Sequence, residues 1–119
     1  MRRKIYLSGP MTGDGTPEAM RKNVAEGIRM AKVLMRAGFA VMCPHLTGLM
    51  PGHLEFAYAE WIANDLPWVA VSDAVFRLRG KSAGADAEVD FATECDVPVF
   101  TTLSSLLAYF PEVGMRGMS

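Results

Sequence analysis

The order of apolar and polar residues along the chain predicts strands and helices in strict alternation. Short apolar runs predict four strands, at 4–8, 39–43, 73–79 and 97–101. Longer stretches with an apolar residue every three or four positions predict four helices, at 16–37, 54–66, 84–95 and 103–110. Pro67 is expected to end or kink the second helix, although a further turn through Val71 remains open. Prolines and glycines between 44 and 53 predict a loop.

The apolar positions also predict which helix faces pack inward. The first helix should begin at Thr16 and Pro17 and stop at Gly38. Its expected core face consists of Met20, Val24, Ile28, Ala31 and Met35. The expected core face of the second helix consists of Phe56, Ala59, Ile62 and Ala63.

This alternation implies a parallel sheet covered by helices on both faces. We therefore expect an α/β fold, a Rossmann-like or flavodoxin-like three-layer sandwich with a parallel sheet of four to five strands. The 119 residues suit a single domain over 1–119, with 110–119 expected to fray. In such sheets ligands bind at the carboxyl ends of the strands, where the chain order reverses.

Composition narrows the function classes. A net charge of −1 gives no long-range attraction to nucleic acid or to an anionic membrane, so neither partner is expected. No run approaches the roughly 20 apolar residues of a membrane span, and no secretory signal is recognised, so we expect a cytoplasmic protein. Cys43 and Cys95 are expected to be buried or half-buried free thiols, which suits a reducing compartment.

The turn after the first strand reads Ser8-Gly9-Pro10-Met11-Thr12-Gly13. Such a glycine-rich turn leaves backbone N–H groups free to meet an anion. It lacks the lysine of a Walker A loop, and Pro10 breaks the dinucleotide-binding pattern, which argues against a dehydrogenase-like protein. The simpler alternative is a turn that needs glycine for its backbone alone.

Glu88 lies near the start of the third predicted helix, where the helix dipole favours an ionised carboxylate by about 0.3–1 kcal/mol. A carboxylate must be ionised to act as a nucleophile. Asp65 follows Asn64 near a helix end that disfavours a carboxylate, which raises its pKa. The two acids suit glycosidic chemistry. The alternatives are that Glu88 only complements the helix dipole and that Asp65 simply lies at a solvated helix end.

Three further side chains are candidates. Tyr6, on the first strand, either packs in the core or directs its hydroxyl at Glu88. His45 and His53 flank a loop that could cover a ligand. These histidines have no partners at metal-ligand spacing, so we expect no metal site and no cofactor.

Four short segments, taken together, resemble a known enzyme family. They are Tyr6-Leu7-Ser8-Gly9-Pro10, Asn64-Asp65, Ser72-Asp73-Ala74-Val75 and Ser82-x-Gly84-x-x-x-Glu88. In this order they resemble the nucleoside 2-deoxyribosyltransferase superfamily, which includes the 2-deoxynucleoside 5-monophosphate N-glycosidases. The chain is similar to a short branch of this superfamily in bacteria and phages. The resemblance extends from Ile5 to about Phe100.

The resemblance implies roles for the candidates. Glu88 would be the nucleophile that forms a glycosyl-enzyme, Asp65 would assist protonation of the leaving base, and Tyr6 would orient Glu88. The residues implied for the sugar and phosphate pocket are Ser8, Gly9, Pro10, Met11, His45, Ser82 and Gly84.

The implied activity is cleavage of the N-glycosidic bond of a nucleoside or nucleoside 5-monophosphate, with water or a second base as acceptor. Because the serine that matches Ser82 meets the phosphate from a partner subunit, a homodimer or dimer of dimers with a shared site is implied. The alternative is a nucleotide-binding module that has lost the chemistry.

One departure from the family pattern stands close to the nucleophile. Asp86 replaces a glycine of the better-known members, and a second acid there is expected to raise the pKa of Glu88. Arg77 and Arg79 are expected to share one strand face, where they would offset that charge or grip a phosphate. The alternative is that both are surface arginines.

Overall fold

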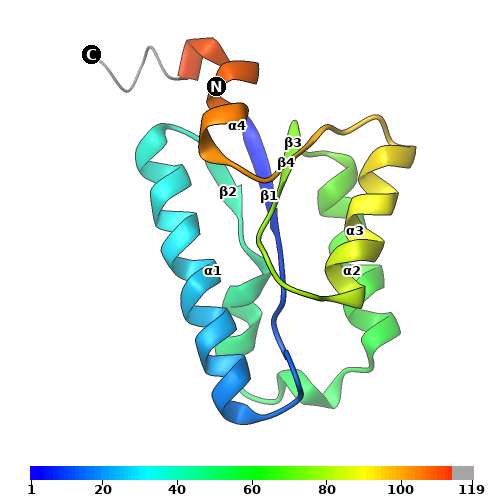
Figure 1. The fold of residues 1–119 in the computed structure, drawn as a ribbon. Helices are drawn as coiled ribbons and strands as arrows, with labels where there is room; N and C mark the ends of the chain where they lie inside the picture. The colour runs from blue at the N-terminus through cyan, green and yellow to red at the C-terminus, as the bar shows by residue number, and fades with distance from the viewer. Residues whose placement is uncertain (114–119) are drawn as a thin grey trace.

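Strands and helices alternate along residues 1–113, the part of the chain that the computed structural model describes (Figure 1). The strands are β1 (Lys4–Ser8), β2 (Ala40–Met42), β3 (Ala74–Arg77) and β4 (Val99–Phe100). The helices are α1 (Pro17–Ala37), α2 (Tyr58–Ala70), α3 (Ala83–Glu94) and α4 (Leu103–Tyr109). Two short 3-10 helices, η1 (Pro44–Leu49) and η2 (His53–Glu55), lie in the predicted loop before α2.

The strands form one parallel sheet in the order β2-β1-β3-β4. Helices α1 and α4 cover one face, and α2 and α3 cover the other (Figure 1). The three-layer α/β fold predicted from the sequence is therefore confirmed, with four strands in the described residues. The chain order reverses between β1 and β3, which is where ligands bind in sheets of this kind.

The residues of β1 alternate between the two faces of the sheet, as the pleat requires. Ile5 and Leu7 join the apolar core under α1 and α4. Tyr6 belongs to the smaller core under α2 and α3, and Ser8 is 1% exposed. Because both faces are covered, the strand reads as a nearly continuous apolar run.

Helix α1 begins and ends where its sequence predicts. The Thr16 hydroxyl accepts a hydrogen bond from Ala19 N at 3.2 Å, and Gly38 ends the helix at a φ of 112°. The predicted core face is shifted, because Met35 is 54% exposed and Leu34 is buried in its place. The residues buried along α1 are Val24, Gly27, Ala31 and Leu34.

Helix α2 differs more from its prediction. It begins later, at Tyr58, and continues through Pro67 to Ala70, so the further turn is present. Three of its predicted core residues, Phe56, Ala59 and Ala63, are exposed, because Phe56 precedes the helix and α2 contacts mainly α3. Only Val69 of this helix is fully buried.

Part of the segment expected to fray is packed against the domain. Phe110 and Val113 are buried in the core under α1 and α4, and Arg3 Nε donates to Glu112 Oε1 at 3.0 Å. The rest of that expectation, 114–119, lies outside the described residues.

The two cysteines differ from each other. Cys43 is buried as expected, whereas Cys95 is exposed because it caps the free end of α3. Within residues 1–113, no helix combines the length and the apolar character needed to cross a membrane.

Candidate active site

Polar side chains gather where β1 and β3 end, at the point where the chain order reverses. Ser8 and Arg77 are register partners at the ends of these neighbouring strands. Both lie on the face covered by α2 and α3, because they continue the alternation of Tyr6 and Val75. The predicted parallel sheet placed the expected ligand site at this edge of the sheet.

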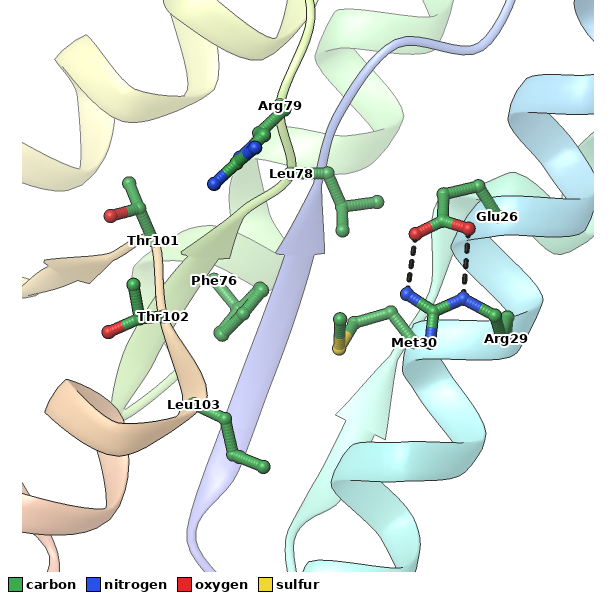
Figure 2. A pocket seen from close by; sticks show the side chains of 9 residues that line it. All are labelled: Glu26, Arg29, Met30, Phe76, Leu78, Arg79, Thr101, Thr102 and Leu103. Atoms are coloured by element: carbon green, nitrogen blue, oxygen red, sulfur yellow. Dashed lines mark hydrogen bonds and ion pairs between the residues drawn. The ribbon is translucent and has the colours of Figure 1, made fainter.

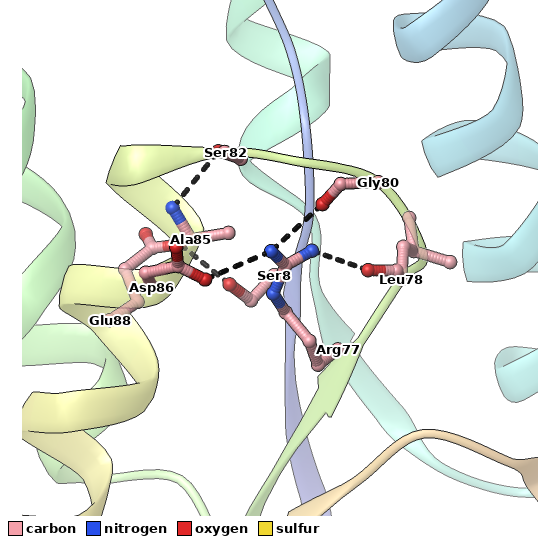
Figure 3. Close-up of polar contacts among 8 residues, drawn as sticks. All are labelled: Ser8, Arg77, Leu78, Gly80, Ser82, Ala85, Asp86 and Glu88. Atoms are coloured by element: carbon pink, nitrogen blue, oxygen red, sulfur yellow. Dashed lines mark hydrogen bonds and ion pairs between the residues drawn. The ribbon is translucent and has the colours of Figure 1, made fainter.

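Glu88 is the centre of this cluster. The Ser82 hydroxyl caps α3 by accepting from Ala85 N at 3.1 Å, and the helix then directs Glu88 at the sheet. The Glu88 side chain is only 7% exposed. Tyr6 donates its hydroxyl hydrogen to Glu88 Oε2. Ser8 Oγ donates to Glu88 Oε1 at 2.8 Å, as Figure 3 shows. Of the two readings of Tyr6, core packing or contact with Glu88, the structure supports both at once.

The electrostatics of the cluster follow from burial. Burial raises the pKa of Glu88, and the hydrogen bonds from Tyr6 and Ser8 partly oppose this shift because they stabilise the anion. Burial also raises the pKa of Tyr6, and the neighbouring Glu88 charge raises it further. Tyr6 therefore stays protonated and donates to the carboxylate.

Asp65 reaches the same cluster from α2. It is half-buried, and burial raises its pKa above the usual aspartate range. Its negative charge in turn raises the pKa of Glu88 and of Tyr6, so it lies within electrostatic reach of both. Burial therefore shifts the pKa of both acids of the cluster in the same direction, toward the protonated form.

The turn after β1 interlocks with the turn after β3. A Cβ on Gly9 would lie 2.7 Å from Leu78 Cβ, so only glycine fits against that side chain. Gly80, with a φ of 116°, receives the Pro10 ring, and a Cβ there would lie 2.7 Å from Pro10 Cγ. Both glycines are thus required for the backbone geometry that brings the two turns together.

His45 supports this turn from behind. It was predicted as a pocket residue, and its side chain is only 1% exposed. Its Nε2 lies 3.0 Å from the Pro10 carbonyl oxygen, and its Nδ1 faces Cys43 Sγ at 3.9 Å. Burial lowers the pKa of His45, so the ring is neutral and Nε2 carries the proton that it donates to Pro10.

Met11 and Gly84 are the remaining predicted pocket residues. The Met11 carbonyl accepts from Asn23 Nδ2 at 3.3 Å, which ties the turn to α1. Gly84 lies in the first turn of α3, where a Cβ would be 3.6 Å from the Tyr58 ring. Tyr58, which is 59% exposed and lies beside Gly84, was not among the residues predicted from the sequence. Its position two helical turns before Asp65 puts both on one face of α2, and that spacing was the available signal.

The Arg77 guanidinium contacts three protein groups. It donates to the Leu78 carbonyl, to the Gly80 carbonyl at 2.9 Å and to Asp86 Oδ1 at 3.1 Å (Figure 3). The Asp86 charge is thus paired with Arg77, and it is not among the groups that shift the pKa of Glu88, contrary to our expectation. The Arg77 charge lowers the pKa of Glu88.

With this geometry in place, comparison with known proteins gives the family. The sequence profile described as "Domain of unknown function (DUF4406)" matches residues 3–101. The chain belongs to this family. A comparison with curated proteins found no match for the DUF4406 chain.

The DUF4406 chain also matches a solved structure, a 2-deoxyribosyltransferase from the psychrotolerant bacterium Bacillus psychrosaccharolyticus. The two chains are 27% identical, and the match covers 81% of this chain and 69% of the other, with a TM-score of 0.57. The resemblance to the nucleoside 2-deoxyribosyltransferase superfamily is therefore confirmed.

A separate hollow of about 330 Å³ lies on the other face of the DUF4406 domain, between α1 and the start of α4 (Figure 2). Its lining includes none of the four clustered residues Tyr6, Ser8, Asp65 and Glu88. Arg79 lines it, so Arg77 and Arg79 do not share one strand face as expected, because β3 ends at Arg77. Residues 1–113 contain no group of three or more His, Cys, Asp or Glu arranged to hold a metal ion.

Proposed function

We propose that the protein cleaves the N-glycosidic bond of a nucleoside or nucleotide, with Glu88 as the nucleophile. The observation that carries the proposal is a buried carboxylate whose two oxygens accept hydrogen bonds from Tyr6 and Ser8. It lies beside a second acid, Asp65, at the topological switch point of the sheet. Two carboxyl groups in such a place are the chemical requirement of a retaining glycosidic reaction.

The proposed first step forms one bond and breaks one. A Glu88 oxygen attacks C1′ of the sugar, the C1′–N bond breaks, and its electron pair passes to the base. The Asp65 carboxyl gives its proton to the departing base nitrogen. Burial raises the pKa of Asp65, which is the direction of shift that favours a proton donor. The product is a glycosyl ester on Glu88 and a free base.

The proposed second step releases the sugar. The Asp65 carboxylate accepts a proton from water, or from a second base, as that molecule attacks C1′. The ester bond breaks, and its electron pair returns to the Glu88 carboxylate. Tyr6 and Ser8 then donate again to the restored anion, which is the charged form that their hydroxyls stabilise.

Two findings support an active enzyme over a binding module of the same fold. The matched structure is a 2-deoxyribosyltransferase, and the clustered residues here are those that the resemblance assigned to catalysis. Asp86 was the main sequence feature against activity, and its charge is paired with Arg77.

We also propose that the protein acts as a homodimer through the surface of η1, η2 and α2. Large apolar side chains are exposed along these segments and just after α2: Leu46, Leu49, Met50, Leu54, Phe56, Tyr58, Trp68 and Val71. So many exposed apolar side chains in consecutive elements support an interface there. Light scattering of the purified protein is expected to give the mass of a dimer, and a monomer at micromolar concentration would contradict the proposal.

The activity is tested by release of free base from a panel of nucleosides and their 5′-monophosphates, followed by chromatography. Glu88→Gln should reduce the rate by at least about 10³-fold, because Gln cannot form the ester. Glu94→Gln is the matched control, since it changes an exposed acid at the far end of the same helix. Tight binding of a nucleoside with no base release by the unmodified protein would instead identify a binding module.

A further inference from the structure

The hollow between α1 and the start of α4 has an apolar floor that the fold holds in place. Phe76 of β3 and Leu78, just after it, form this floor, and they are 3% and 8% exposed. Met30 and Leu103 complete the apolar lining, and all four side chains belong to the core under α1 and α4 or pack against it. Because the core fixes these side chains, the concave surface is formed before any ligand arrives.

The size of the hollow suits a small molecule. Its volume of about 330 Å³ lies at the lower end of the range for ligand pockets, which is about 300–1,000 Å³. A flat body of one or two rings is of the size that such a space accepts. Such a body would displace water from the apolar floor, which favours binding.

The charged groups of the hollow lie on opposite sides of the floor (Figure 2). On the α1 side, Arg29 donates to the two carboxylate oxygens of Glu26 at 2.7 and 2.9 Å, so these two charges neutralise each other. On the other side, Arg79 has no hydrogen-bond or ion-pair partner within residues 1–113. Two arginines and one glutamate thus leave the lining with a net charge of +1.

Arg79 differs in this respect from Arg77, two positions earlier. The Arg77 guanidinium donates to two backbone carbonyls and to Asp86, whereas no group in the described part of the chain accepts from Arg79. A guanidinium is planar and can donate two parallel hydrogen bonds to one carboxylate. An exposed arginine by itself holds an anion weakly in water, so affinity requires the charge and the apolar floor together.

We propose that this hollow is a second ligand site, which binds a small monoanion with a flat apolar body, of the chemical class of the aromatic carboxylates. The carboxylate accepts two hydrogen bonds from Arg79, and the ring lies on Phe76 and Leu78. A single negative charge balances the net charge of the lining, whereas a phosphate dianion exceeds it and meets the Glu26 carboxylate as a like charge. The lining includes no residue of the Glu88 cluster, so the inference does not depend on the proposed function.

The experiment titrates 2-naphthoate into the ¹⁵N-labelled protein at pH 7 and follows the backbone amide signals by NMR. We expect saturable shifts at Phe76, Leu78 and Leu103, with a Kd of about 1 mM or lower, the order expected for a ligand of this size. The uncharged 2-naphthol and the dianion 2-naphthyl phosphate should each bind at least about threefold more weakly.

Arg79→Gln tests the charged part of the site. It should weaken the binding of 2-naphthoate about three- to tenfold and leave the binding of 2-naphthol unchanged, because it removes only the charge. The variant should fold normally, since Arg79 is exposed and holds no other group within residues 1–113. Arg36→Gln is the matched control, since it removes an exposed charge in the last turn of α1, outside the hollow, and should change neither affinity.

The inference is overturned if 2-naphthol or 2-naphthyl phosphate binds as tightly as 2-naphthoate, or if Arg79→Gln binds 2-naphthoate as the unmodified protein does. It is also overturned if the shifts centre on the exposed apolar residues of α2 or on Ser8 and Glu88, because the probe then lies elsewhere. Base release plays no part in these measurements, so a failure of the proposed function would leave their outcome unchanged.

Discussion

The two faces of the sheet use alternate residues of the same strand for different purposes. On the face toward α1 and α4, Ile5 and Leu7 are fully buried among apolar side chains. On the face toward α2 and α3, Tyr6 and Ser8 are equally buried but donate hydrogen bonds to a carboxylate. The five residues of β1 therefore contribute both to the hydrophobic stabilisation of the fold and to the polar groups of the candidate site.

A substitution on the apolar face should have the largest effect, and it should lower the stability of the fold rather than the activity. Leu7→Ala removes a side chain that is 0% exposed, and it should lower the free energy of unfolding by about 2–5 kcal/mol. Urea denaturation measures this loss. The folded fraction should keep most of its activity, because the Leu7 side chain points away from Glu88.

Met35→Ala is the control for this loss. Met35 lies on α1, which covers the same face, and is 54% exposed, so its truncation should cost less than about 0.5 kcal/mol. Equal losses for the two variants would mean that the apolar face does not supply the stability assigned to it.

A substitution on the polar face should affect activity more than stability. Tyr6→Phe removes one hydrogen bond to the Glu88 anion, and kcat/KM for base release should fall about 10- to 100-fold. The pKa of Glu88 should rise further, because that hydrogen bond lowers it, so the acid limb of the pH profile should move to higher pH.

Tyr109→Phe is the matched control, since Tyr109 is 56% exposed on α4 and makes no contact with the cluster. An unchanged pH profile in Tyr6→Phe would contradict the role of the hydroxyl, even if the rate fell.

The smallest expected effect is on thermal stability, which the burial of the ionised Glu88 carboxylate lowers. Because burial raises the pKa of Glu88, the folded state binds its proton more tightly than the unfolded chain. Stability from this group is therefore present at low pH and decreases as pH rises above about 4.5, the ordinary glutamate value. Glu88→Gln should raise Tm by about 2–5 °C at pH 7, and the difference should vanish near pH 4.

Glu94→Gln, at an exposed position, should leave Tm unchanged at both pH values. A lower Tm for Glu88→Gln at pH 7 would show that the ionised carboxylate stabilises the fold, and it would overturn this account of the polar face.

Local signals predicted most of the fold. The capped start of α1, its glycine stop and the alternating order of elements all act within a few residues, so they can be read along the chain. The inward faces of α1 and α2 could not be read in this way. Met35 of α1 and Phe56, which precedes α2, are apolar but exposed, and the periodicity of one segment does not say which of its apolar residues meet the core.

The candidate site was predicted in its parts but not in its arrangement. Glu88, Asp65 and Tyr6 were named from the sequence, and the structure brings them into one cluster. The position of His45 depends on Gly27, where a Cβ would lie 2.3 Å from the imidazole Cγ. Contacts of this kind join distant segments, and a single sequence carries no local signal for them.

The cluster around Glu88 has a consequence for how the protein is made. Tyr6 and Glu88 are separated by 82 positions, so a chain leaving the ribosome has no hydroxyl–carboxylate cluster until its third long helix has emerged. Translation products that stop before that point contain the first strand and the glycine turn but lack the acid that those groups surround. Formation of this cluster therefore requires a chain that has been synthesised at least through α3.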